Sequence, residues 1–459
     1  MRKTAILLIM LALTCACWAS AATAGAGQAK AFPYTYYIDD LPNGLRIITI
    51  PTDYPNLVAY YAVVQAGSRN EVEPGKSGFA HLFEHLMFRG SKNFTPRQRD
   101  EIMQSAGVNG NAYTTDDRTV YHLVFAREDM DKMLELEGDR FQRLEYSRDV
   151  FKTETGAVLG EYNKNSANPV RKILEVLRET AFKKHTYSHT TMGYLRDIED
   201  MPNQYDYSIE FYNRYYRPEY TTIVMVGDIT RAQSVAAIKK HFGEWKRGNY
   251  VAQIATEPPQ AAPQKAHIEW ATPTLPWVAV AYRGPAYSDT EKDLAALSVL
   301  GQMAFGSNSE LYRKLVLNEQ KVEALGGDVS FRIDPELFTV MARVKDAKDV
   351  DYVRDQILAT VKQFSETLVP AGKLAATRSR MRYEFALSLD SSEAIALNVA
   401  PYVGLRRTPE TINNLYALYD QVSPEDIRNA ARKYFAESNR SIVTLATKAK
   451  AASTEGGQQ

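Results

Sequence analysis

Cysteine is almost absent from this chain. Its only two residues, Cys15 and Cys17, lie in the first twenty positions. Two basic residues there precede the apolar run "AILLIMLAL" and the small residues "ASAATAGAG", a pattern typical of a secretory signal peptide. The run is too short for a permanent membrane span. We therefore expect residues 1–24 to be a signal peptide and the mature chain to be exported, into a bacterial periplasm, without disulfides or thiolate metal ligands.

An excess of charge of either sign is also missing. Lys and Arg together number 55, as do Asp and Glu. This balance gives no basis for binding nucleic acid or an anionic membrane surface, and no apolar run after the leader predicts stable membrane insertion. The 45% of hydrophobic residues is that of an ordinary globular protein with an ample core. Histidine is scarce, with seven residues in 459, so its placement is informative.

Two halves of the chain repeat a similar order of elements. "LVAYYAVVQAGSRNE" and "FYNRYYRPEYTTIVMVGD" in the first half have counterparts in "WVAVAYRGPAYSDTE" and "NAARKYFAESNRSIVTLAT" in the second, which indicates an internal duplication. A proline-rich stretch separates them, as expected of an extended linker. We predict an N-terminal domain over 30–245, a linker over 246–266, a homologous domain over 267–450 and a disordered tail over 451–459.

The segment "GFAHLFEHLMFRG" places His81, Glu84 and His85 in an otherwise apolar run. On a helix these positions share one face, and the two imidazoles stand one turn apart, about 6 Å along the axis. This is the H-x-x-E-H pattern, in which two histidines bind zinc and the glutamate accepts a proton from the attacking water. The counterpart segment, "ALSVLGQMAFGSNSE", has none of the three, which argues against a packing role.

Catalytic zinc takes three protein ligands and keeps one position open. The candidates for the third ligand are Glu154 and Glu161 in "FKTETGAVLGEYNKN", seven residues apart and on one face of a predicted helix. One could bind the ion while the other orients a ligand. A solvated acidic face is the alternative interpretation of both residues. His185 and His189 in "HTYSHTTMG" mimic a second metal pair, but the surrounding Thr and Gly favour a structural loop.

With these residues the chain resembles the pitrilysin or insulinase family of zinc peptidases, which includes the mitochondrial processing peptidases. "GSRNEVEPGKSGFAHLFEHLMFRGSKNFT" matches the family's first-half signature. The resemblance implies one Zn²⁺ per chain, with Glu161, 76 positions after His85, as third ligand and Glu154 as the acidic residue near the metal. It also implies that "GVNGNAYTTDDRTVYHLVF" contains an Asn-Ala-x-Thr turn before an edge strand that pairs with an extended substrate, with Asn111 and Ala112 in contact with substrate backbone. An ordinary hairpin turn is the alternative interpretation.

The same resemblance implies the fold. It is α+β, with two homologous sheet-plus-helices domains of the mitochondrial processing peptidase-like (LuxS-like metallohydrolase) type, forming half of a clam-shell around a chamber. One departure concerns "LYRKLVLNEQKVEAL", where Val316 replaces an arginine and no tyrosine follows before Gly326. The chain thus resembles the zinc-bearing subunit of a heterodimer whose metal-free homologous partner carries that Arg/Tyr pair; a homodimer is the alternative.

These observations predict a zinc metalloendopeptidase that hydrolyses peptides or unfolded polypeptides, with His81, His85 and Glu161 as metal ligands and Glu84 as general base. Two rivals belong to other classes. One is a non-catalytic chamber subunit that binds polypeptides for a partner, and the other is a protein in which zinc only stabilises the first domain.

Overall fold

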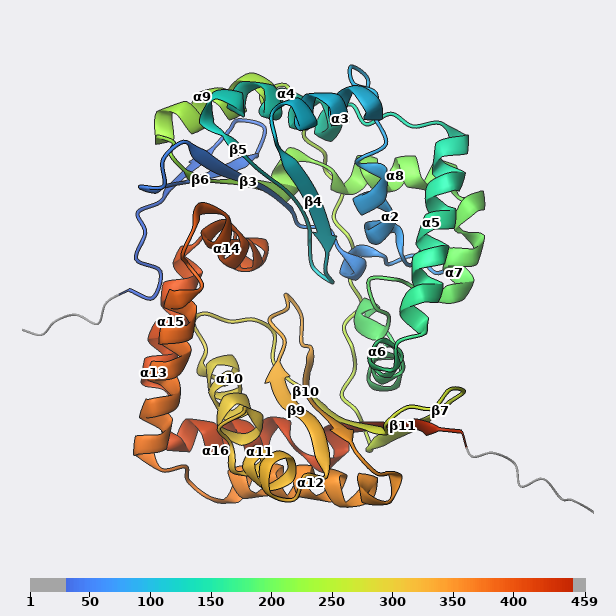
Figure 1. The fold of residues 1–459 in the computed structure, drawn as a ribbon, viewed down its shortest axis with the longest axis vertical. Coiled ribbons are helices and arrows are strands. Elements are labelled where there is room, and N and C mark those ends of the chain that lie inside the picture. Colours follow the sequence, from blue (N-terminus) through green and yellow to red (C-terminus); the bar gives the residue numbers. More distant parts are fainter. Residues whose placement is uncertain (1–29, 449–459) are drawn as a thin grey trace, which may run out of the picture.

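The chain forms two β-sheets with their helices, one from each half of the sequence (Figure 1). The computed structural model describes residues 30–448, so the predicted signal peptide, both cysteines and the predicted tail at 451–459 lie outside the described residues. Within 30–448, none of the helices is both long and apolar enough to cross a membrane.

The first sheet has six strands in the order β1-β2-β6-β3-β5-β4, and the second has five in the order β7-β11-β8-β10-β9. The first comprises β1 (Tyr37–Asp40), β2 (Arg46–Pro51), β3 (Leu57–Val64), β4 (Asn109–Thr114), β5 (Thr119–Ala126) and β6 (Thr221–Gly227). The second comprises β7 (Gln264–Trp270), β8 (Trp277–Arg283), β9 (Val322–Val329), β10 (Leu337–Val344) and β11 (Arg440–Thr447).

The second sheet repeats five of the six strands of the first, all but β1. β2 runs parallel to β6 and β7 parallel to β11, whereas every other neighbouring pair in both sheets is antiparallel. The order β2-β6-β3-β5-β4 therefore recurs as β7-β11-β8-β10-β9. The predicted α+β fold of two similar domains is confirmed, and β4 and β9 occupy equivalent edges.

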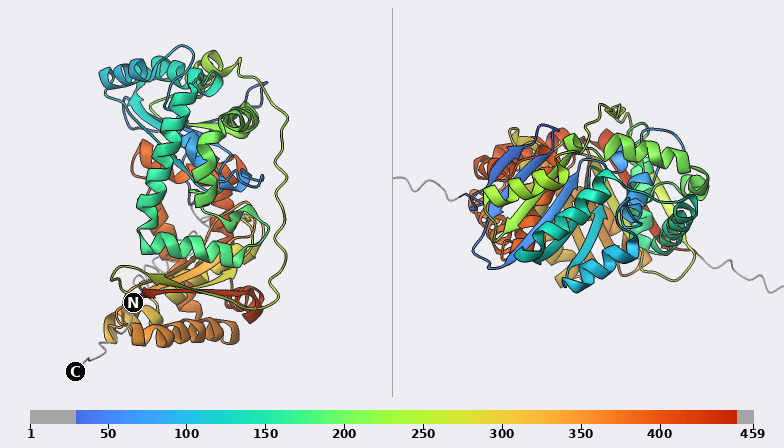
Figure 2. Two further views of the ribbon diagram at one scale, coloured as in Figure 1. Left: turned by 90° about the vertical axis from the view of Figure 1, so that its right-hand side faces the viewer. Right: turned by 90° about the horizontal axis from the view of Figure 1, so that it is seen from above.

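Helices cover both sheets. The first half contains α2 (Phe79–Leu86), α3 (Pro96–Ser105), α4 (Met130–Gln142), α5 (Arg148–Ser166), α6 (Pro169–Ala181), α7 (Leu195–Asp200), α8 (Tyr205–Tyr215) and α9 (Arg231–Phe242). The second contains α10 (Lys292–Phe305), α11 (Glu310–Tyr312), α12 (Val350–Glu366), α13 (Ala371–Leu387), α14 (Ser392–Arg406), α15 (Glu410–Gln421) and α16 (Pro424–Tyr434). Between β6 and β7 the chain crosses the outer side of the molecule without forming a helix or strand after α9 (Figure 2). The predicted linker over 246–266 covers most of this stretch, and its last residues begin β7; the predicted domain limits stay a prediction.

The central strands are apolar on both faces because both faces are buried. In β3, Val58, Tyr60, Ala62 and Val64 pack into one core, while the alternate residues Ala59, Tyr61 and Val63 pack into another. A strand buried on both sides needs a continuous apolar run instead of alternation. This explains the sequence "LVAYYAVV".

The two domains exchange one helix each. Helix α14, from the second half, packs on β3 and β6 of the first sheet, and α6, from the first half, packs on β7, β8 and β11 of the second (Figure 1). Asn168 caps α6 by accepting from the Val170 N–H at 2.9 Å. Its apolar residues Ile173 and Leu177, one turn apart, then face Ala279 and Leu445. Each sheet therefore has one face covered by the other domain's helix.

The exchange predicts that a cavity in α6 destabilises the second domain. Leu177 is 1% exposed in the cluster formed with the second sheet. We expect Leu177→Ala to lower the free energy of unfolding by about 2–5 kcal/mol, from lost burial and the cavity left behind. Denaturant unfolding would measure the change, and Leu195→Ala, at a site 38% exposed, is the control and should cost much less. If the second domain of the Leu177→Ala variant unfolded in its own transition with the same stability as in the wild type, the helix exchange would be contradicted.

Candidate metal centre

Helix α2 begins at a buried carboxylate. Gly78 precedes it with φ of 92°, a left-handed conformation that favours glycine. The side chain of Glu71 accepts hydrogen bonds from the backbone N–H groups of Gly78 and Ala80, at 2.8 and 2.7 Å. Its oxygens satisfy N–H groups that have no partner within the helix, while burial raises the pKa of Glu71 well above its ordinary value. Glu71 thus fixes the start of the helix that carries the two histidines.

The apolar side of α2 holds the helix against the first domain. Phe79, Leu82, Phe83 and Leu86 are fully buried. The Phe83 ring stacks on Phe211 with centroids 5.2 Å apart. His81 and His85 project toward α5, where they contact its glutamates, and Glu84 projects toward β4.

Helix α5 supplies the carboxylates. Ser147 caps it, accepting from the Val150 N–H at 3.2 Å. Glu154 and Glu161, two turns apart, both face α2, as their contacts with its histidines show. Glu154 is 4% exposed as a residue, whereas the side chain of Glu161 is 40% exposed.

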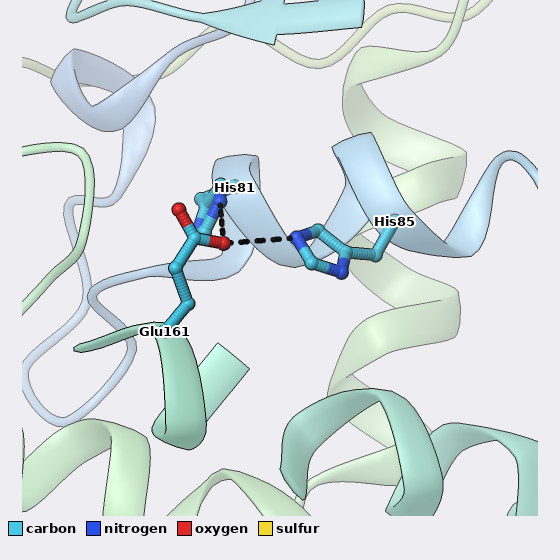
Figure 3. Close-up of side chains that lie close together, drawn as sticks. All are labelled: His81, His85 and Glu161. Carbon is cyan, nitrogen blue, oxygen red and sulfur yellow. Dashed lines mark ion pairs between the residues drawn. The ribbon is translucent and has the colours of Figure 1, made fainter. Parts of the chain in front are cut away.

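His81, His85 and Glu161 converge on one point (Figure 3). The Glu161 Oε2 atom lies 3.4 Å from His81 Nε2 and 3.5 Å from His85 Nε2. One ligand atom from each residue lies within 4.8 Å of the other two. Within residues 30–448, no other group of three or more His, Cys, Asp or Glu side chains gathers in this way.

The electrostatics of the three side chains favour a cation. Contact with the His81 imidazole, aided by the charge of His85, lowers the pKa of Glu161 to about 2 against the opposing effect of burial. Burial and the neighbouring His81 lower the pKa of His85. At neutral pH the carboxylate is therefore ionised and the His85 ring neutral, which are the states that bind metal.

The donor set fits zinc. Two imidazole nitrogens and one carboxylate oxygen are its usual ligands at catalytic sites with three protein ligands. The Nε2 atom of His81 faces the Glu161 carboxylate. Its Nδ1 atom is buried without a hydrogen-bond partner. These residues therefore suit one divalent ion with a position left for solvent.

Glu154 lies behind the cluster. Its Oε2 atom is 3.6 Å from His85 Nδ1, and its Oε1 atom is 2.7 Å from Arg89 Nε. It faces the ring nitrogen of His85 that points away from Glu161. This is the place of an outer carboxylate that orients a metal-binding histidine.

Glu84 faces β4. Its Oε2 atom accepts a hydrogen bond from the Thr114 hydroxyl at 2.7 Å. It has no ion pair with either histidine among the contacts of residues 30–448. Sequence reasoning missed Thr114, Arg89 and Glu71. Thr114 is the last residue of the quoted Asn-Ala-x-Thr sequence, so that sequence could have identified it. No motif spacing identifies Arg89 or Glu71.

β4 is an edge strand, and Asn111 and Ala112 lie within it, whereas the resemblance implied a turn before an edge strand. It pairs with β5 on one side, in a register that places Asn111 opposite His122 and Ala112 opposite Tyr121. The Ala112 N–H donates to the side chain of Asn111 at 2.9 Å. Beside the end of β4, a cavity of about 730 Å³ lies between the domains, lined by Thr114 and Thr115 on one side and by β9 and β10 on the other.

The remaining histidines take part in ordinary contacts. His185 Nε2 pairs with Asp334 at 2.9 Å and its Nδ1 accepts from the Tyr187 N–H, so its ring joins two domains. His189 is buried beside Glu71. These contacts match the structural role expected for the "HTYSHTTMG" loop. His122 stacks on Tyr61, and His241 and His267 bond to Asp131 and Thr444.

Known proteins resemble this chain over most of its length. The "Zinc protease PqqE" of Helicobacter pylori is 25% identical over 411 residues, 88% of this chain and 91% of that protein. The "Probable mitochondrial-processing peptidase subunit beta" of Arabidopsis thaliana is 24% identical over 426 residues, 89% of this chain and 78% of that protein. A crystal structure of a protease from Helicobacter pylori superposes with a TM-score of 0.84 at 25% identity, covering 90% of this chain and 99% of that one.

Two family models match consecutive parts of the chain. The model described as "Insulinase (Peptidase family M16)" matches residues 46–194, which include His81, Glu84, His85 and Glu161. The model described as "Peptidase M16 inactive domain" matches residues 204–381, in which the sequence has no H-x-x-E-H. The predicted resemblance is confirmed: the chain belongs to the M16 peptidase family, the insulinase or pitrilysin family, whose N-terminal and inactive domains it carries in order.

Proposed function

We propose that this protein is a zinc metalloendopeptidase that hydrolyses peptides or unfolded polypeptides. One observation carries the proposal: His81, His85 and Glu161 bring ligand atoms within 4.8 Å of one another, while Glu84 stands on the same helix between the histidines. Three ligands and a separate carboxylate are what metal-assisted hydrolysis requires. The zinc proteases among its relatives support the same activity.

Each residue has a distinct part. A bound Zn²⁺, held by His81, His85 and Glu161, would polarise the scissile carbonyl and lower the pKa of water. Glu84 accepts the proton of the attacking water and delivers it to the leaving nitrogen. Thr114 occupies its Oε2 atom, which leaves Oε1 as the proton acceptor. Glu154 holds the His85 ring from behind, and Arg89 holds Glu154.

The substrate binds as an added strand beside β4. Asn111 and Ala112 lie on this edge, and an incoming peptide carbonyl would replace the Asn111 side chain as acceptor for the Ala112 N–H. Recognition through backbone groups gives loose sequence preference. The cavity of about 730 Å³ between the domains provides room for an extended chain, and not for a folded protein, beside Thr114.

The working enzyme is a heterodimer in a bacterial periplasm. The basic, apolar and small-residue order of the leader supports export. Val316 occupies the position at which complete enzymes of the family carry an arginine. A metal-free homologous partner would therefore supply the Arg/Tyr pair and close the chamber. A homodimer is the alternative. The rival function, a non-catalytic subunit that binds polypeptides, is disfavoured by the complete ligand set.

Metal content tests the ligands. We expect about one zinc per chain by elemental analysis of protein purified without chelators, and Glu161→Gln or His81→Ala should weaken zinc binding by more than about 100-fold, since outer partners alone are worth roughly 10–100-fold. Glu84→Gln should keep its zinc. Equal zinc in the Glu161→Gln variant would remove that residue from the ligand set.

Peptide hydrolysis tests the base. Glu84→Gln should lower kcat about 100- to 10,000-fold, because the amide cannot accept the proton. The control is Glu101→Gln, at an exposed glutamate on α3 paired only with Arg97, which should leave kcat unchanged. An active wild-type enzyme whose Glu84→Gln variant cleaves equally well would exclude Glu84 from the mechanism. A zinc-loaded wild type with no activity under any condition would favour the non-catalytic rival.

The partner is tested by reconstitution. We expect the purified chain alone to have low activity, and a metal-free homologue encoded beside it to raise that activity and comigrate with it in size exclusion. The partner's effect should disappear when its Arg and Tyr are replaced. Full activity from a monodisperse preparation of this chain alone would contradict the heterodimer.

A further inference from the structure

The turn between β4 and β5, residues Thr115–Arg118, is a buried polar contact between the two domains. Asp116, Asp117 and Arg118 are 2%, 1% and 6% exposed. Burying an ionised carboxylate costs free energy unless it is paired. The partners of these side chains therefore show which groups hold the turn in place. Those partners come from both halves of the chain.

Asp116 is shared by two arginines. Arg178 of α6 donates to both of its oxygens, at 2.6 and 2.9 Å, and Arg332 of the β9–β10 loop donates from Nε at 2.6 Å. Burial opposes ionisation of Asp116, but the two guanidinium groups outweigh it and hold its pKa far below the usual range. The carboxylate is therefore a charged link between the first domain and the second.

Asp117 makes the second link. It accepts from the Tyr187 hydroxyl at 2.6 Å and from the backbone N–H of Ile333 at 2.9 Å. Asp116 and Asp117 thus both bind the loop that joins β9 and β10. The turn is docked on the second domain by a charged side chain and by a backbone group.

The turn has little freedom to adjust on its own domain. The Ser68 and Arg69 N–H groups donate to the carbonyl groups of Thr115 and Asp116. A Cβ at Gly67 would lie 2.3 Å from both of those oxygens. The backbone at Gly67 and the backbone of the turn are therefore too close for a side chain to fit between them. A shift of the turn must then be passed on to the strand that enters it, which ends at Thr114.

Thr114 is the residue of β4 that touches Glu84. Its hydroxyl donates to Glu84 Oε2 at 2.7 Å, one residue before the docked turn. A continuous path of contacts and chain therefore runs from Arg332 through Asp116 and the turn to Thr114 and Glu84. The matched control lies elsewhere: the Tyr36 hydroxyl bonds Glu410 of α15 at 2.5 Å, also between the two halves, without reaching β4.

We propose that Arg332 and Thr114 are positioning residues for Glu84, coupled through Asp116, so that the base is set for proton transfer only while the second domain is docked on the β4–β5 turn. The inference rests on the proposed function of Glu84. It assigns the inactive domain a part in the reaction that needs no contact with the metal.

Steady-state kinetics on the zinc-loaded full chain, with its partner if one is required, tests the coupling. Thr114→Val removes the hydroxyl at constant shape and should lower kcat on the order of 10- to 100-fold with KM nearly unchanged. Thr114→Ser should restore it. Arg332→Gln, in which Asp116 keeps Arg178 and the fold is retained, should lower kcat on the order of 10-fold. The double variant should be no worse than Thr114→Val.

Several outcomes overturn the proposal. A rise in KM alone for Arg332→Gln would make Arg332 a substrate contact. Additive losses of kcat in the double variant would show that the two residues act independently. Failure of Thr114→Ser to restore kcat, or an equal loss of kcat in Tyr36→Phe, would also overturn the proposal. All variants should keep the wild-type zinc content, and a loss of zinc would assign the effect to the metal site.

Hydrogen–deuterium exchange on the metal-free chain gives a readout independent of activity. Arg332→Gln should speed exchange in the segment 113–119 and in residues 67–70 that bond to it, and Tyr36→Phe should not. Unchanged exchange in Arg332→Gln would overturn the docking, even if the wild type proves inactive. An inactive wild type with the expected exchange would instead reject the proposed function and keep the docked turn.

Discussion

The exchange of helices α6 and α14 is the constraint on which the rest of this structure depends. A sheet with one uncovered apolar face is not stable in water, and each sheet here obtains its second cover from the other domain. The domains are therefore linked by hydrophobic burial, the largest favourable contribution to folding, and not only by surface contacts. A hinge between them would have to open a core.

The exchange also gives the ionic cluster its surroundings. Arg178 stands on α6, the exchanged helix, with its guanidinium at the Asp116 turn, and Arg332 reaches the same carboxylate from the second domain. Because apolar burial fixes the relative position of these elements, the buried charges find their partners without further ordering cost. The apolar packing thus sets the relative position of the domains, and the ionic cluster pairs the charges that this packing buries.

The sequence predicted which residues form the candidate metal centre more completely than it predicted the fold around them. His81, Glu84 and His85 are close in the chain, so helical spacing alone places them together. The presence of two similar domains followed from the duplication, but the order of the strands within each sheet did not. The helix exchange did not, since the period of Ile173, Leu177 and Ala181 shows that α6 buries one face and not which sheet receives it. The sequence did not indicate the roles of Asp116 and Asp117, because their partners are distant. Arg178 and Arg332 lie 62 and 216 positions from Asp116. Tyr187 and Ile333 lie 70 and 216 positions from Asp117.

The two copies of the duplicated unit have diverged in how their equivalent helices meet solvent. In α2, Glu84 is half-buried toward β4 and His85 is half-buried toward α5. In α10, the helix of the corresponding segment, residues Leu294 to Gly301 are all buried, and Gly301 packs so closely on β9 that a Cβ would lie 2.9 Å from the Gly327 oxygen. In the corresponding segment Ser298, Gly301 and Gln302 stand at the positions of His81, Glu84 and His85. Gln302 is half-buried and accepts a hydrogen bond from Arg380, so α10 offers an amide and a hydroxyl in place of the imidazoles and the carboxylate that zinc prefers.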